Sequence, residues 1–155
     1  MDFALSEEQE LIVKTTRAFV EAELLPHEAE VERTGELREE LRRQIVEKSK
    51  ALGLYAFNMP AELGGGGLDA LSQCLVDREL GRASFALQYS VTRPSNILRA
   101  CQGEQVERYL LPSIRGERID CLAMTAPRAG SDLRPMTTRA EQAGGRLTIV
   151  VDPAE

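Results

Sequence analysis

Apolar residues follow two different periods along this chain, and the change falls near residue 118. Before it, they recur every three or four positions, which is typical of helices that bury one face. After it, they form short runs between glycine and proline turns, which is typical of strands. The pattern predicts a mainly α protein, with an α-helical N-terminal domain over 1–118 and two or three strands over 119–155. So few strands do not make an independent domain.

The helical part begins with two stretches that strongly predict helices. Ser6 and Gln9 have the spacing of a capping box in front of a periodic stretch that we expect to run over about 7–24 and to end at Pro26. A second stripe of leucine and isoleucine runs over 37–52 and stops before a glycine, the residue that best forms a left-handed cap. Both stretches predict amphipathic helices.

The rest of the pattern gives shorter elements. The acidic segment 27–33 allows a short helix. The run Gly64–Gly67 must form a loop, because each glycine inside a helix costs about 1 kcal/mol relative to alanine. Further amphipathic helices are predicted over 68–83 and 106–114, and a more buried helix over 86–100 that is interrupted at Pro94 or begins there. Strands are predicted over 119–124, 137–140 and 147–151.

Charge and composition exclude several classes of protein. Nineteen Lys and Arg against 25 Asp and Glu give a net charge of −6, which disfavours nucleic-acid partners. No apolar run reaches the roughly 20 residues of a membrane span, and the acidic start lacks a secretory or transit signal. We therefore expect a soluble, cytoplasmic protein with no membrane partner. The three cysteines are widely spaced, so we predict small buried thiols, with neither disulfides nor a zinc site.

Few side chains suggest catalysis or metal binding. His27 is the only histidine and has no second ligand at a suitable spacing, so no metal site is expected. The glycine run lacks the Lys-Ser/Thr of a phosphate-binding loop, which favours a structural turn. No carboxylate can be assigned as a general base from spacing alone. The sequence therefore identifies no catalytic residue.

The strongest chemical signal is the turn at 122–133, which reads LAMTAPRAGSDL. Such a turn exposes backbone N–H groups and the hydroxyls of Thr125 and Ser131, and Gly130 lets a ligand approach the chain closely. These features suit a pyrophosphate or the polar edge of an isoalloxazine. The same residue types also favour an ordinary turn between a strand and a loop.

Seven short motifs, in order along the chain, together resemble the acyl-CoA dehydrogenase family. They are Phe3-x-Leu5-x-Glu7-Glu8-Gln9, Pro60-x-Glu62-x-Gly64-Gly65, Glu79-Leu80-Gly81, Gly103-Glu104-Gln105, Tyr109-Leu110-x-Pro112, Gly116-Glu117 and the turn. The resemblance implies an N-terminal helical bundle followed by a β-barrel middle domain, of which 119–155 would be the incomplete start. It also implies FAD-dependent α,β-dehydrogenation of an acyl-CoA thioester and a place in fatty acid metabolism.

The resemblance also assigns the cofactor-binding residues. Leu122, Met124 and Thr125 correspond to the segment that meets the flavin ring, and Gly130 and Ser131 correspond to contacts on the pyrophosphate side. Two positions depart from the family pattern. Ala126 stands where the family usually has an acidic residue, and Arg128 stands where it has glycine or another small residue.

The chain ends at Glu155, before the second flavin strand and the C-terminal bundle that carries the catalytic glutamate in the family. We therefore expect weak FAD binding and no activity from this truncated chain alone. Two alternatives are a non-catalytic helical interaction module and one subunit of a split flavoenzyme. A homo-oligomer or a completing partner chain is expected, because unpaired strands and an uncovered bundle face expose apolar surface.

Overall fold

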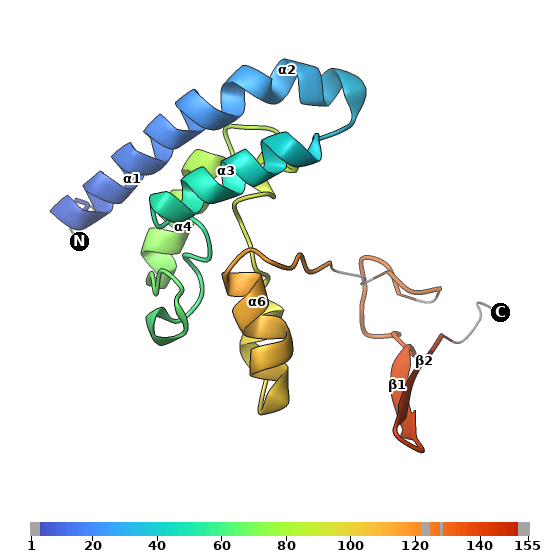
Figure 1. The fold of residues 1–155 in the computed structure, drawn as a ribbon. Helices are drawn as coiled ribbons and strands as arrows, with labels where there is room; N and C mark the ends of the chain where they lie inside the picture. The colour runs from blue at the N-terminus through green and yellow to red at the C-terminus, as the bar shows by residue number, and fades with distance from the viewer. Residues whose placement is uncertain (1–3, 122–124, 128, 152–155) are drawn as a thin grey trace. The chain divides into compact units, whose positions relative to one another are not determined.

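The computed structural model describes residues 4–121, 125–127 and 129–151 (Figure 1). The chain forms two compact units, 1–120 and 121–155. In chain order the elements are α1 (Glu7–Phe19), a π-helical turn (Val20–Leu24), α2 (Leu25–Thr34), α3 (Glu39–Ala51), a 3-10 turn (Ala61–Leu63), α4 (Ala70–Leu80), α5 (Phe85–Gln88), a 3-10 turn (Asn96–Ala100), a second π-helical turn (Val106–Leu110), α6 (Leu111–Ile114), β1 (Arg139–Ala143) and β2 (Arg146–Val150). The mainly α fold class is confirmed. Within the described ranges, no helix has the length and apolar character that crossing a membrane requires.

Helix α1 begins as the sequence predicts. The Ser6 hydroxyl accepts a hydrogen bond from the backbone N–H of Gln9 at 3.2 Å, and the Gln9 side chain accepts one from the N–H of Ser6 at 3.1 Å. The two bonds satisfy donors that the first helical turn would otherwise leave free.

The predicted helix end at Pro26 is wrong. The helical path continues from α1 through the π-helical turn into α2, and Figure 1 shows the two helices as one nearly continuous rod. The Leu25 N–H donates to the carbonyl of Val20, five residues back. This wider turn is followed directly by the first turn of α2, where Pro26 needs no N–H donor.

A π-helical turn also precedes Pro112. There the Leu111 N–H donates to the carbonyl of Val106, and the proline again lies in the first turn of the helix that follows, α6. A π-helical turn before a proline thus lets the chain keep its direction where a regular α-helix would lose a hydrogen bond and clash with the proline ring.

The helix predicted over 86–100 is interrupted around Pro94, which is one of the two forms expected there. Only α5 and a 3-10 turn form there, and between them the chain makes tertiary hydrogen bonds. The carbonyl of Arg93 accepts a bond from the N–H of Ala56 at 2.9 Å, and the Asp120 carboxylate accepts one from the N–H of Ser95 at 3.3 Å. Because Pro94 cannot donate a helical hydrogen bond, these contacts replace the helix.

The core of the first unit has two apolar clusters. The larger one joins side chains of α1 to α5 and the loops between them, including the fully buried Leu24, Leu80 and Leu87. The smaller one joins Val46 of α3 and the segment 55–59 to the region of α6, and Met59 is its most buried member. The predicted amphipathic faces of α1, α3 and α4 supply much of the larger cluster.

A buried carboxylate ties α1 to α4. The Glu79 side chain is 2% exposed, and it accepts hydrogen bonds from Arg17 Nε at 2.9 Å and Nη2 at 3.0 Å and from Arg78 Nη2 at 2.9 Å. The hydrogen bond from Arg17 lowers the pKa of Glu79 below its ordinary value of 4.5. The adjacent Leu80 is fully buried, so this pair explains the Glu79-Leu80-Gly81 motif structurally.

The glycine run forms a tight structural loop. Each of its four N–H groups donates to a backbone carbonyl, and the acceptors are, in order, those of Ala61, Pro60, Ala56 and Met59. None of these N–H groups is left for a phosphate. A methyl group on Gly65 would overlap the carbonyl of Met59, and one on Gly66 would lie 2.7 Å from Cα of Phe57. The glycines therefore let two segments pack directly against each other, as expected for a structural turn.

The second unit contains an antiparallel hairpin. Strands β1 and β2 pair with Arg139 opposite Val150 and Ala143 opposite Arg146. Gly144 and Gly145 form the two-residue turn with φ of +57° and +76°, the left-handed values that such hairpins favour. The strand predicted over 147–151 corresponds to β2, and the strand predicted over 137–140 overlaps the start of β1. Residues 119–121 are not in a strand, and 122–124 lie outside the described residues.

The cysteines differ from the prediction of buried thiols. Cys74 and Cys121 are exposed and Cys101 is half-buried. Cys74 lies on α4, whose buried face is formed by other residues, including Leu75 and Leu80. The spacing of cysteines in a sequence does not show which face of a helix each one occupies.

We predict that Glu79→Gln lowers the free energy of unfolding by about 2 kcal/mol at pH 7, because two arginines lose a charged hydrogen-bond acceptor. Urea denaturation followed by circular dichroism measures this. Glu40→Gln is the control, since Glu40 is exposed on α3, and it should change stability by less than about 0.5 kcal/mol.

The difference in the free energy of unfolding between wild type and Glu79→Gln should become smaller as the pH falls. The folded-state pKa of Glu79 is lowered, so its contribution is fully present above the ordinary pKa of 4.5 and is lost as pH falls through the lower, folded-state value. A difference that persists undiminished in strong acid would contradict the proposed role of the charge.

We predict that Gly65→Ala lowers the free energy of unfolding by about 3 kcal/mol, because the added methyl group must displace the backbone of Met59. Gly35→Ala is the comparison, since Gly35 has φ of +68° and a methyl group added to it would meet nothing within 4 Å. Its backbone strain alone should cost about 1 kcal/mol. Equal losses in the two variants would mean that close packing at Gly65 is not the cause.

Candidate functional site

The turn expected to meet a flavin belongs to the second unit. Thr125, Gly130 and Ser131 are described there, and all three are exposed. Leu122 and Met124 lie outside the described residues, as does Arg128.

A pair of backbone hydrogen bonds shapes this turn. The N–H of Ala126 donates to the carbonyl of Ala129 at 2.9 Å, and the N–H of Ala129 donates to the carbonyl of Ala126 at 3.0 Å. Because this bridge closes the chain on itself, Thr125 and Gly130 flank it on the two sides of the turn. The structure thus brings together Thr125 and the Gly130–Ser131 pair, which the sequence assigned to one site.

The flanking backbone is available to a ligand. The N–H groups of Thr125, Gly130 and Ser131 donate to no other described residue. A methyl group built on Gly130 would meet nothing within 4 Å, so the chain there is open to close approach. N–H groups that have no acceptor among the described residues and lie beside two hydroxyls can donate to the oxygens of a pyrophosphate or to the carbonyl edge of a flavin.

Asp132 stabilises the far side of the turn. Its carboxylate accepts hydrogen bonds from the backbone N–H of Arg134 at 3.0 Å and from Arg134 Nη2 at 2.8 Å. The side-chain hydrogen bond of Arg134 lowers the pKa of Asp132 below its ordinary value. Asp132 therefore holds the loop in shape, and its charge is balanced by Arg134.

The site has groups for binding but none placed for acid–base chemistry among the residues described. Within those residues, no set of three His, Cys, Asp or Glu side chains could hold a metal ion. His27 lies half-buried in α2, in the other unit. The arrangement supports ligand binding at the turn and assigns no catalytic residue.

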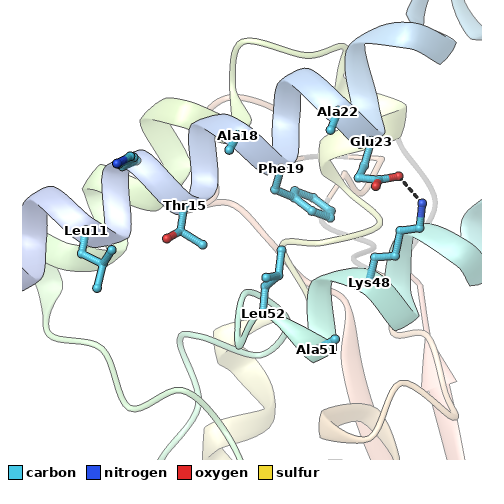
Figure 2. Close-up of a pocket in the computed structure, with 10 residues that line it drawn as sticks. Leu11, Thr15, Ala18, Phe19, Ala22, Glu23, Lys48, Ala51 and Leu52 are labelled. Atoms are coloured by element: carbon cyan, nitrogen blue, oxygen red, sulfur yellow. Dashed lines mark hydrogen bonds and ion pairs between the residues drawn. The ribbon is translucent and has the colours of Figure 1, made fainter.

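A second feature, which the sequence did not reveal, is an apolar groove in the first unit (Figure 2). It lies between α1 with its π-helical extension and the end of α3, and its volume is about 620 Å³. In Figure 2, Phe19 and Leu52 point toward each other across it, and the ion pair of Glu23 with Lys48 closes one end. The groove is lined by Leu11, Lys14, Thr15, Ala18, Phe19, Ala22, Glu23, Lys48, Ala51 and Leu52.

The lining leaves large apolar side chains exposed to solvent. Leu11 is 63% exposed and Leu52 is 49% exposed. Small side chains, Thr15, Ala18 and Ala22, follow Leu11 along α1 and its π-helical extension and would let another element approach closely. Their spacing of three and four residues was the only sequence signal, and it is the same spacing that marks a core-facing stripe.

Comparison with known proteins identifies the family. A model of the N-terminal domain of acyl-CoA dehydrogenases matches residues 6–117. The chain is 36% identical to 3-(aryl)acrylate reductase of Clostridium sporogenes, over 94% of this chain and 40% of that protein. It is also 36% identical to mitochondrial isovaleryl-CoA dehydrogenase of Pongo abelii, over 94% of this chain and 35% of that protein.

A solved structure of an acyl-CoA dehydrogenase is also similar to this chain. Glutaryl-CoA dehydrogenase from Mycobacterium smegmatis in complex with FADH2 superimposes with a TM-score of 0.77 and 26% identity, over 95% of this chain and 38% of that chain. The chain thus spans two-fifths or less of the length of these three relatives. The family model covers most of the chain, and the resemblance drawn from the seven motifs is confirmed: this chain belongs to the acyl-CoA dehydrogenase family.

Proposed function

We propose that this chain provides the N-terminal helical domain, 1–118, and the first strands of the middle β-domain, 119–155, of an FAD-dependent acyl-CoA dehydrogenase. The observation that carries the proposal is the family match over 6–117, followed by a turn in which the N–H groups of Thr125, Gly130 and Ser131 donate to no other described residue. The substrate is an acyl-CoA thioester, the class named in several relatives, including isovaleryl-CoA dehydrogenase.

The described residues of the turn would bind and orient the flavin. The Thr125 N–H and hydroxyl suit the polar edge of the ring, while the open backbone at Gly130 and the hydroxyl of Ser131 suit the pyrophosphate. Leu122 and Met124 would add apolar contacts to the ring. When bound, FAD would accept the hydride removed from the substrate, and the protein would orient the two.

The chain alone is proposed to be inactive. No carboxylate of the described turn is free to take the α-proton, because Asp132 is paired with Arg134. The general base would come from polypeptide outside these 155 residues, either a continuation of the family fold or a completing partner chain. The flavin half-site would accordingly bind FAD weakly by itself.

We predict saturable but weak FAD binding by the isolated chain, with a dissociation constant above about 10 µM. Equilibrium dialysis, together with the visible flavin spectrum, measures it. Ser131→Ala should weaken FAD binding about tenfold, because it removes a hydrogen bond to a charged phosphate. It should leave riboflavin binding unchanged, since riboflavin has no phosphate.

Thr34→Val is the matched control for this experiment. Thr34 is an exposed hydroxyl at the end of α2, in the other unit, so its loss should not affect either ligand. Absence of saturable FAD binding at about 1 mM, or an equal effect of Ser131→Ala on FAD and riboflavin, would contradict the assigned half-site.

A second candidate function is helical interaction through the apolar groove, with a second copy of this chain as the proposed occupant. The exposed Leu11 and Leu52 favour it, because burying such side chains gains free energy in proportion to the apolar area covered. This association requires no cofactor, so it remains a separate function if the flavin site fails.

We predict that Leu11→Glu shifts the chain toward the monomer in sedimentation-velocity ultracentrifugation, because the charge would be desolvated in the groove. Leu71→Glu is the matched control: Leu71 is similarly exposed, at 53%, but lies on α4 outside the groove. A wild-type chain that stays monomeric at about 100 µM, or equal shifts in both variants, would argue against self-association through the groove.

A further inference from the structure

Arg93 is a buried arginine with part of its guanidinium unused. The residue is 6% exposed, and its Nη1 donates to Asp120 Oδ2 at 2.9 Å. The guanidinium carbon lies 3.4 Å from the centre of the Tyr89 ring, a cation–π contact. Its Nε is buried and has no hydrogen-bond partner among the described residues. A buried donor without a partner costs free energy, so a ligand that accepted a hydrogen bond from this nitrogen would offset that cost.

A cavity of about 210 Å³ lies beside this arginine, within the first unit. Its apolar and aromatic walls come from α5 and from segments far apart in the sequence. The lining residues are Leu37, Arg42, Tyr55, Ala86, Tyr89, Ser90, Arg93 and Ile119. The cavity therefore combines apolar walls with two guanidinium groups.

The charged side chains that line the cavity are both cationic. Arg42 and Arg93 both line it, whereas no carboxylate of a described residue does. Their partners, Glu39 and Asp120, contact the two arginines from outside the lining. The buried Tyr55 hydroxyl donates to the carbonyl of Ser113 at 3.3 Å, and burial raises the pKa of this hydroxyl, so it stays neutral at physiological pH.

The free edge of Arg93 suits a planar carboxylate. Asp120 uses only Nη1, which leaves Nε and Nη2 without hydrogen bonds to described residues. These two donors point in the parallel directions that a carboxylate accepts in a bidentate pair. A cavity of about 150 Å³ accepts benzene, so the volume here allows a carboxylate that carries a small ring or a short chain.

We propose that this cavity is a binding site for a small carboxylate with an apolar or aromatic tail, held by the Nε–Nη2 edge of Arg93. The site lies in the helical unit and is independent of the proposed flavin turn in the other unit. A negative result at this cavity would therefore not argue against the proposed flavin half-site, and a negative result at the half-site would not argue against the cavity.

Benzoate is the probe, titrated to about 20 mM into the full 155-residue chain. Its binding is followed through the side-chain ¹⁵Nε–¹Hε resonance of Arg93, assigned by its loss in Arg93→Lys. Saturable binding that shifts this resonance is expected. Benzamide has the same shape without the charge and should bind at least tenfold more weakly. Phosphate, a charged group without an apolar tail, should also bind at least tenfold more weakly.

Two variants and one control identify the site. Arg93→Lys keeps the charge but loses the bidentate edge, and it should weaken benzoate binding at least tenfold. Ala86→Phe fills the cavity from the exposed side of α5 and leaves Arg93 and Asp120 in place, so it should abolish binding even if Arg93→Lys fails to fold. Arg99→Lys, at an exposed arginine in the 3-10 turn after Ser95, should have no effect.

Several results would overturn the proposal. Absence of saturable benzoate binding would mean that the cavity holds only solvent. If benzamide bound as tightly as benzoate, the negative charge would not contribute to binding. If phosphate bound as tightly as benzoate, the apolar walls would not contribute. Benzoate binding that survives Ala86→Phe would place the ligand elsewhere on the chain.

Discussion

The pairing of α1 with α4 depends on Glu79, a carboxylate that is buried and charged at the same time. Removing such a group from water is costly unless charged partners compensate for it, and here Arg17 reaches across from α1 while Arg78 reaches from the same helix. The pair fixes which turn of α1 lies against which turn of α4. Another side of α1 then faces α3, where the apolar groove forms.

Features that depend on a few neighbouring residues could be predicted from the sequence. The capping box at Ser6 and the glycine loop both follow from local hydrogen bonding, and the structure confirms them. A turn in the segment predicted to meet a flavin could likewise be expected from its residue types, because its bridge closes within four residues, Ala126 to Ala129. The role of that turn remains a prediction from the family.

Other features could not be predicted, because they depend on a rare backbone turn or on contacts between distant segments. Pro26 does not end the helical path, since the π-helical turn before it accommodates the proline ring. The tertiary bond between Ala56 and Arg93, which no local pattern reveals, replaces the helix expected over 86–100. The groove and the Arg93 cavity are hidden in the sequence for the same reason, since each is lined by residues more than 25 positions apart.

The exposed thiols give the molecule two natural attachment points for spectroscopic labels. Cys74 lies on α4 in the first unit and Cys121 is the first residue of the second, so a label on each would report on a different unit. Replacing the half-buried Cys101 by serine would leave this pair alone among the three cysteines. A donor and an acceptor dye there would turn any movement between the helical unit and the hairpin unit, on addition of flavin or a partner chain, into a change in energy transfer.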